Sequence, residues 1–229
     1  MKAMILAAGL GNRMRPLTLH TPKPLLAVAD KPLIVWHIEK LQKIGVTDIV
    51  INTAWLADKL IAALGTGDQF GVRIHWSNEG EGLETAGGII HALPLLGDQP
   101  FILVNGDVWT NYDFAPLLQV ELGQNLAHLM LVDNPVQHPQ GDFVLSAQKA
   151  YTFEQNQQGE ALTYSGIAVI SPEMFAGLAE GKRPLAPLLK EAMLQGRISA
   201  QKLPAAWVDV GTPERLSDLD RQIRQRQYA

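Results

Sequence analysis

Short apolar runs alternate with longer amphipathic segments through the first 105 residues of the chain. The runs are continuous, which is typical of strands that are buried on both faces of a sheet. The expected strands are 2–8, 48–52, 72–76 and 101–104. Helical spacing of apolar residues predicts helices at 32–44, 56–64 and 85–96. Strands that alternate with helices predict βαβ units and a mostly parallel sheet.

The second half of the chain is less regular. Its shorter apolar segments predict strands at 126–132, 143–145, 150–153, 163–170, 198–203 and 207–210. Two amphipathic segments predict helices at 185–195 and 213–225. Several of these strands are short and are separated by polar loops, which indicates an antiparallel patch beside the main sheet.

Composition narrows the classes of protein to consider. Apolar residues make up 47% and charged residues 18% of the 229 residues, so the chain can bury a large core. The net charge of −4 argues against a protein that coats nucleic acid, because that role needs a basic face. The chain has no Cys, which excludes disulfides, thiolate zinc sites, iron–sulfur clusters and cysteine nucleophiles.

The sequence contains no apolar stretch long enough for a membrane-spanning helix. The apolar residues near the N-terminus are followed directly by Arg13 and Arg15, where a signal peptide would carry small, neutral residues. A buried first strand that leads into a loop fits this pattern better. We therefore expect a protein of the cytoplasm that has no membrane partner.

The loop after the first strand is the first candidate for chemistry. Gly9 and Gly11 would let backbone N–H groups close on an anion, and Arg13 and Lys23 would add the cations that bind phosphate. The loop matches neither the dinucleotide fingerprint, since Met14 stands at the third Gly, nor the Walker phosphate loop. An ordinary strand-to-helix turn with surface charges is the alternative.

Two carboxylates stand at the ends of predicted strands, Asp107 and Asp209. The carboxyl ends of parallel strands line the ligand crevice of an open α/β sheet, so Asp107 should face whatever the first loop holds. Mg²⁺ is commonly bound by one or two carboxylates together with substrate phosphates. Either Asp alone could simply cap a turn or helix. Together with the basic loop, the pair favours a magnesium–phosphate site.

Six motifs spread over nearly the whole chain resemble one family. They are Gly-Leu-Gly-Asn-Arg-Met-Arg-Pro-Leu-Thr at 9–18, Pro-Lys-Pro-Leu at 22–25, Leu-Glu-Thr-Ala-Gly-Gly at 83–88, Asn-Gly-Asp at 105–107, Ser-Gly-Ile at 165–167 and Trp-Val-Asp-Val-Gly-Thr at 207–212. This set resembles the nucleotidyltransferases that join a nucleoside triphosphate to a sugar 1-phosphate.

Within that family the likeness is greatest to the short uridylyltransferases of bacterial cell-wall recycling, and Glu84 stands where many relatives have Gly. No hexapeptide repeat follows, so an attached acetyltransferase is not expected. The resemblance implies an α/β, Rossmann-like three-layer nucleotidyltransferase fold with a mostly parallel central sheet and a small antiparallel sugar-binding lobe. It also implies one domain over 1–229, with a nucleotide-binding half at 1–110 and a sugar-binding half at 111–229.

The resemblance also implies residue roles. The nucleotide would be bound by Gly9, Gly11, Asn12, Arg13, Lys23 and Glu79, with Lys23 and Arg13 as the catalytic cations. Asp107 and Asp209 would hold Mg²⁺. The sugar phosphate would lie among Asn105, Gly141 and Glu154. A partial match around Glu154 makes the sugar pocket the least defined part of the site.

Glu79 falls where many thymidylyl- and uridylyltransferases use Gln to read the base. Uracil presents an N3–H donor between two carbonyl acceptors, and a carboxylate can accept from it. Adenine lacks this donor, whereas guanine presents a comparable N–H. A solvated loop charge is the alternative for Glu79. A shift of the alignment would transfer the role to Asn78 or Glu81.

The expected reaction is transfer of a uridylyl group from UTP to a sugar 1-phosphate, with Mg²⁺ as cofactor. It needs positioning and charge neutralisation and no general base, because the nucleophile is already an anion. Glucose 1-phosphate with dTTP and mannose 1-phosphate with GTP are alternative substrate pairs. A nucleotide sensor without catalysis is an alternative from another class. The expected partners are small molecules, with no nucleic acid, and the protein would be a monomer or a weak homo-oligomer.

Overall fold

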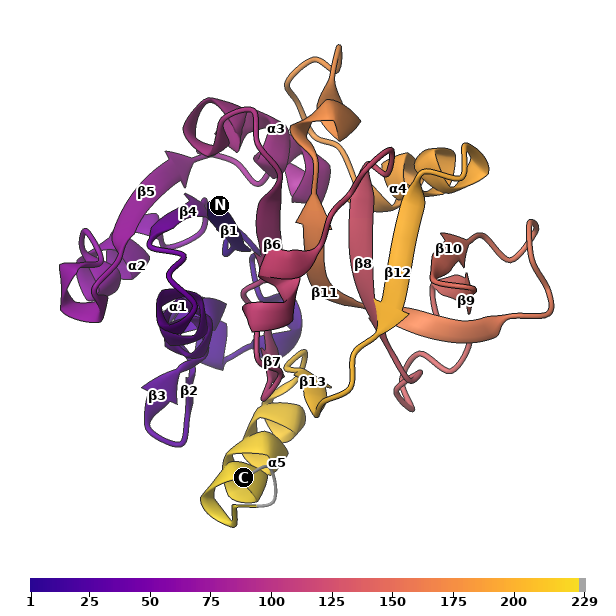
Figure 1. The fold of residues 1–229 in the computed structure, drawn as a ribbon. Helices are drawn as coiled ribbons and strands as arrows, with labels where there is room; N and C mark the ends of the chain where they lie inside the picture. The colour runs from indigo at the N-terminus through magenta and orange to yellow at the C-terminus, as the bar shows by residue number, and fades with distance from the viewer. Residues whose placement is uncertain (227–229) are drawn as a thin grey trace.

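The computed structural model describes residues 1–226, and nine strands of this part form one mixed sheet with helices on both faces (Figure 1). Across the sheet the strand order is β5-β4-β1-β6-β11-β8-β12-β10-β9. In chain order these strands are β1 (Ala3–Leu6), β4 (Asp48–Thr53), β5 (Arg73–Asn78), β6 (Phe101–Asn105), β8 (Ala127–Val132), β9 (Phe143–Ser146), β10 (Lys149–Tyr151), β11 (Glu160–Ile170) and β12 (Ile198–Lys202). Each overlaps a strand that the apolar pattern predicts.

The strands of the first half confirm the predicted parallel sheet. β1 pairs in parallel with β4 on one side and with β6 on the other, and β4 pairs in parallel with β5. In this register Met4 lies between Val50 and Leu103, and all three side chains are fully buried. Helices cover both faces here, which explains why these strands are continuous apolar runs in the sequence.

The strands of the second half extend the same sheet. β11 runs antiparallel to both β6 and β8, and its first residues pair with β9. Its pairing with β8 shifts register between Tyr164 and Ile167, so the strand is irregular at Ser165 and Gly166. β9 and β10 form an antiparallel hairpin that lies between β12 and the first residues of β11. The predicted antiparallel patch is therefore continuous with the main sheet.

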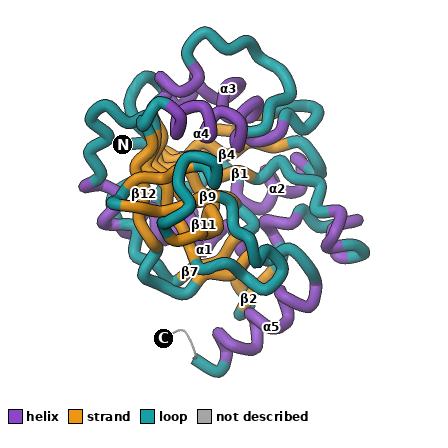
Figure 2. The backbone as a smooth tube through the Cα atoms, turned by 90° about the vertical axis from the view of Figure 1, so that its right-hand side faces the viewer, coloured by secondary structure: helices purple, strands orange, loops and turns teal. Residues whose placement is uncertain are grey.

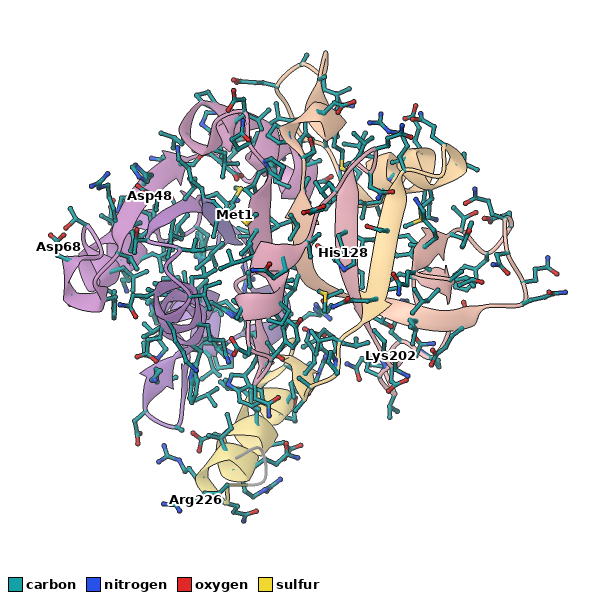
Figure 3. All side chains as sticks on the ribbon, in the orientation of Figure 1. Met1, Asp48, Asp68, His128, Lys202 and Arg226 are labelled. Atoms are coloured by element: carbon teal, nitrogen blue, oxygen red, sulfur yellow. The ribbon has the colours of Figure 1, made fainter. Side chains whose placement is uncertain are left out.

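Five α-helices are described within residues 1–226: α1 (Leu33–Lys43), α2 (Ala57–Leu64), α3 (Glu84–Leu96), α4 (Leu185–Leu194) and α5 (Pro213–Arg224). Buried side chains of α1 and α2 pack on one face of the sheet, and those of α3 and α4 pack on the other. In Figure 2, α3 and α4 lie above the strands and α5 lies below them. Side chains fill the space between these layers (Figure 3), which confirms the predicted three-layer α/β fold.

Two small ladders lie outside the main sheet. β7 (Val108–Thr110) pairs antiparallel with β13 (Trp207–Asp209), and β2 (Ala27–Val28) pairs with β3 (Lys31–Pro32). The sequence predicts β13, as part of a strand at 207–210, and none of the other three, which are too short to show a period. The helix α5 follows β13, and its buried Leu219 joins a third apolar cluster with residues of α1, β2 and β7.

None of the helices in residues 1–226 has the length and apolar character that crossing a bilayer requires.

Candidate active site

A cavity of about 220 Å³ opens at the carboxyl ends of β1, β4 and β6. Parallel strands that end together leave their following loops at one edge of the sheet, so this is the expected place for a ligand. The lining includes Gly9, Lys23, Asn52, Glu84, Asn105 and Asp107. The structure therefore brings the first loop, the Pro-Lys-Pro segment and the Asn-Gly-Asp segment together.

The first loop is folded tightly around Gly11. Its φ of 62° lies in the left-handed region, and a Cβ there would lie 2.8 Å from Thr18 Cγ2. The Thr18 hydroxyl donates a hydrogen bond of 2.7 Å to the Gly11 carbonyl. Only Gly fits this position without displacing Thr18. The resulting loop runs over the mouth of the cavity, where Gly9 lines the wall.

Asn12 and Arg13 lie on a 3-10 turn, Asn12–Met14, beyond the cavity wall. Met14 is fully buried and anchors this turn, whereas Asn12 and Arg13 are exposed. The Arg13 side chain makes no hydrogen bond or ion pair with the residues that the structure describes. A guanidinium with all its donors free can turn toward a triphosphate at the cavity mouth, which is compatible with its predicted role.

Lys23 is the most buried cation near the cavity. Its side chain is 9% exposed, and its Nζ lies 2.6 Å from Asp107 Oδ2. The residue begins a 3-10 turn and is flanked by Pro22 and Pro24, whose rings restrict the backbone on both sides. Asp107 is 39% exposed, so this carboxylate is paired on one side and open to the cavity on the other.

The β7–β13 ladder brings Asp209 beside Asp107. Asp209 pairs with Val108, and the Val210 N–H donates a 3.0 Å hydrogen bond to the Asp107 carbonyl oxygen. The Asp209 carboxylate is itself paired, since Oδ2 lies 2.5 Å from Arg215 Nη1. Asp107 is thus paired with Lys23, and Asp209 is paired with Arg215.

Asp107 and Asp209 offer the donor atoms that a divalent metal ion binds. No cluster of three or more acidic, His or Cys side chains suited to a metal occurs in the described part of the chain. A pair of carboxylates is nevertheless the protein ligand set that Mg²⁺ typically uses when substrate phosphates supply further oxygens. The donor chemistry of Asp107 and Asp209 is hard oxygen only, which suits Mg²⁺ and excludes a preference for soft metals.

A buried side chain, His37, is hydrogen-bonded to the backbone of β7. Burial lowers the pKa of His37 to about 4, so its imidazole is neutral, and Nε2–H donates to the Val108 carbonyl oxygen at 2.8 Å. The His37 ring stacks on Phe114 at a centroid distance of 6.2 Å. His37 therefore fixes the backbone next to Asp107 without taking part in acid–base chemistry. This role could not be predicted from a single His on an apolar helix.

Asn105 has the position expected of a substrate ligand. It lines the cavity, and its buried Oδ1 has no hydrogen-bond partner among residues 1–226. Gly166, with φ 79°, makes room for it, because a Cβ there would lie 2.6 Å from Asn105 Nδ2. Buried polar atoms rarely stay unpaired unless a ligand or water completes them. The irregularity of β11 at Gly166 therefore leaves space for the Asn105 amide.

The other two predicted sugar contacts do not line the cavity. Gly141 has φ 72°, and a Cβ there would lie 2.5 Å from Asn134 Oδ1, so its role is to let the loop fold. Glu154 is exposed in the turn after β10. Hydrogen bonds from its own backbone N–H and from Thr152 hold the pKa of Glu154 below its usual range. The expected sugar contact by Glu154 is thus not supported by its position, because its partners are all local or on α4.

Glu79 makes its bonds within the protein. Its Oε1 accepts from Asn52 Nδ2 at 2.6 Å, and its Oε2 accepts from the Leu83 N–H at 2.7 Å. Asn52 Oδ1 accepts in turn from the Ala7 N–H at 2.7 Å. Glu79 therefore ties the loop before α3 to the end of β1, and it does not line the cavity. Base reading by Glu79 stays a prediction.

Asn52 and Glu84 are two lining residues that the sequence did not single out for substrate contact. Asn52 ends a buried β-branched strand, and a lone amide at such a place is the signal that could have found it. Glu84 begins α3 with φ 61°, a left-handed conformation that costs a non-Gly residue free energy. A non-Gly residue in this conformation on a cavity wall suggests the hypothesis that its side chain contacts the ligand.

We expect Glu84→Gly to raise the free energy of unfolding by about 0.5–1 kcal/mol, because Gly relieves the left-handed strain. The same change should weaken UTP binding several-fold, because the side chain is lost from the cavity wall. Urea unfolding and UTP titration measure the two effects.

Gln148→Gly is the matched control, since Gln148 has φ 60° in the turn between β9 and β10, away from the cavity. It should gain similar stability and leave UTP binding unchanged. If Glu84→Gly bound UTP with the parental affinity, the Glu84 side chain would have no part in nucleotide binding.

Comparison with known proteins agrees with this geometry. The family model described as nucleotidyl transferase matches residues 2–226. An N-acetylmuramate alpha-1-phosphate uridylyltransferase of Neisseria meningitidis serogroup B is 53% identical over 223 residues, covering 95% of this chain and 96% of that protein. A protein of the same name from Caulobacter vibrioides is 36% identical over 93% of this chain and 92% of its own length.

Solved structures show the same fold. A Bacillus anthracis crystal structure, described as a glucose-1-phosphate thymidylyltransferase, superposes with a TM-score of 0.86 at 23% identity. The superposition covers 98% of this chain and 95% of that one. At this identity the likeness concerns the fold alone. The family match over almost the entire chain, together with two relatives well above 30% identity, shows that the chain belongs to the nucleotidyl transferase family.

Proposed function

We propose that the protein transfers the uridylyl group of UTP to N-acetylmuramic acid α-1-phosphate, giving UDP-N-acetylmuramic acid and pyrophosphate. The observation that carries this proposal is the 53% identity, over nearly all of both chains, to a relative of that name. The cavity chemistry supports it, since Lys23, Asp107 and Asn105 offer a cation, a carboxylate and an unpaired amide at one place. Peptidoglycan recycling in the cytoplasm is the setting that this reaction would serve.

The reaction is a single displacement at phosphorus. An oxygen of the sugar phosphate forms a bond to the α-phosphorus of UTP while the bond from that phosphorus to the pyrophosphate oxygen breaks. The nucleophile is an anion already, so no side chain has to remove a proton. The obstacle is repulsion between two sets of phosphate oxygens, and Lys23 and Arg13 would reduce it from the two sides of the first loop.

Members of this family generally use a divalent metal ion, and here we propose Mg²⁺ held by Asp107 and Asp209. When bound, the ion supplies charge neutralisation for the phosphate oxygens. The β7–β13 ladder supports this proposal, because it holds the backbones of Asp107 and Asp209 next to one another before any substrate binds.

We propose that residues 1–229 act as one domain in which 1–110 bind the nucleotide and 111–229 bind the sugar. In support, every lining residue of the first cavity comes from positions 6–107. The β-sheet runs without interruption from one half to the other. A monomer or a weak homo-oligomer suffices for this arrangement, since the cavity described above is built within one chain.

Pyrophosphate release from a matrix of substrates tests the proposal. UTP, dTTP and GTP are each combined with the 1-phosphates of N-acetylmuramic acid, glucose and mannose, in the presence of Mg²⁺. We expect the highest kcat/KM for UTP with N-acetylmuramic acid 1-phosphate. A higher value for another pair would reassign the substrate within the family. Nucleotide binding without pyrophosphate release from any pair would favour a sensor.

A further inference from the structure

A second cavity, of about 600 Å³, adjoins the reaction centre on the side of β13. Its walls come from β13, from the first turns of α5 and from the loop that follows β8. Asp209 lines this cavity, so a molecule bound in it would reach the carboxylate pair from the side of β13. The first cavity is lined instead by residues up to Asp107. The two cavities thus lie next to different members of the carboxylate pair.

Within the described part of the chain, Arg215 is the one cation on the wall of the second cavity. Its Nη1 donates to the carboxylate and to the carbonyl oxygen of Asp209, at 2.5 and 3.1 Å. Its Nε and Nη2 donors have no partner among the described residues. The side chain is 23% exposed, so these donors are partly shielded from water. A guanidinium has five N–H donors, so this one keeps a free edge that can take a second carboxylate.

The remaining acidic groups of this wall do not compete for Arg215. Asp133 is held by Lys202 at 2.6 Å, at the end of β12 where Figure 3 labels Lys202. Asp218 is paired with Arg221 one turn along α5. Asp133 and Asp218 are therefore each paired with a cation other than Arg215.

N-acetylmuramic acid differs from N-acetylglucosamine by a lactyl ether that ends in a carboxylate. An acceptor whose 1-phosphate lies at the carboxylate pair must place this group in a neighbouring space. A partly buried carboxylate needs a charged donor, and Arg binds it in a forked geometry. We propose that Arg215 binds the lactyl carboxylate in the second cavity and so distinguishes the acidic sugar from neutral sugar 1-phosphates. This inference rests on the proposed function.

The test compares two acceptors that differ only in the lactyl group. We measure kcat/KM with UTP for N-acetylmuramic acid 1-phosphate and for N-acetylglucosamine 1-phosphate, in the parent and in Arg215→Gln. The variant should lose about tenfold to a hundredfold more with the acidic sugar than with the neutral one. Arg215→Lys keeps a charge without the fork and should recover part of the preference.

Arg224→Gln is the matched control. Arg224 lies on the same helix in an ion pair with Asp30 and does not line the cavity, so the sugar preference should stay at the parental value. Equal losses on both sugars in Arg215→Gln would show that Arg215 acts only through Asp209, which would overturn the inference and leave the proposed function intact. A parent that does not use N-acetylmuramic acid 1-phosphate would overturn both.

Discussion

Asp107→Ala and Asp209→Ala should each lower kcat by about a hundredfold or more. Both changes would remove a carboxylate from the proposed Mg²⁺ site at the β7–β13 ladder, and with it the charge stabilisation at the phosphates. Each also leaves a buried or half-buried cation, Lys23 or Arg215, without its carboxylate. Single-turnover rates at saturating UTP and Mg²⁺ measure the loss.

Circular dichroism of both variants should match that of the parent, because the carboxylates lie at strand ends outside the apolar clusters. Asp98→Ala, in the loop between α3 and β6, is the matched control and should keep the parental rate. A rate near that of the parent for either active-site variant, in saturating Mg²⁺, would remove that residue from the metal site.

Lys23→Ala should lower kcat much more than it raises the KM for UTP. The amine is 9% exposed and held between two prolines, so it is fixed in place before substrate arrives. A fixed cation favours the arrangement in which charge accumulates between the two phosphates, and such an interaction affects kcat rather than KM. Removal of one such donor costs on the order of a hundredfold.

Steady-state kinetics over a range of UTP concentrations separates the two parameters. Lys31→Ala is the control, since Lys31 pairs with Glu39 on the surface and has no part in the cavity. If Lys23→Ala raised KM alone, Lys23 would anchor the ground state, and the displacement would depend on Arg13 instead.

The sequence predicted most elements of the fold because they are long enough to show a period. β1, β4 and β6 are continuous apolar runs, and α1 shows its buried stripe at Ile34, Ile38 and Leu41. The ladder between β7 and β13 is different, since each strand has three residues and the partners are about a hundred positions apart. No local pattern encodes that pairing, and the sequence did not predict it; the family motifs indicated only that Asp107 and Asp209 belong to one site.

The sequence predicted which residues lie together at the strand ends. It did not predict the hydrogen-bond partners of individual side chains. Lys23 and Asp107 follow from a strand end and a basic loop, and the structure brings them within 2.6 Å. Base reading by Glu79 stays a prediction, and in this structure its two oxygens accept from Asn52 Nδ2 and from the Leu83 N–H. These partners come from separate elements, so the hydrogen bonds of Glu79 depend on how those elements pack and cannot be predicted from the local sequence.

The ladder between β7 and β13 also joins an early and a late part of the chain, so the two carboxylates are not synthesised together. A nascent chain that has reached residue 200 contains every strand up to β11 and the whole lining of the first cavity. It still lacks Asp209 and Arg215, which belong to β13 and α5. A chain released early, or cut before β13, would therefore keep the nucleotide cavity and have only one of the two carboxylates.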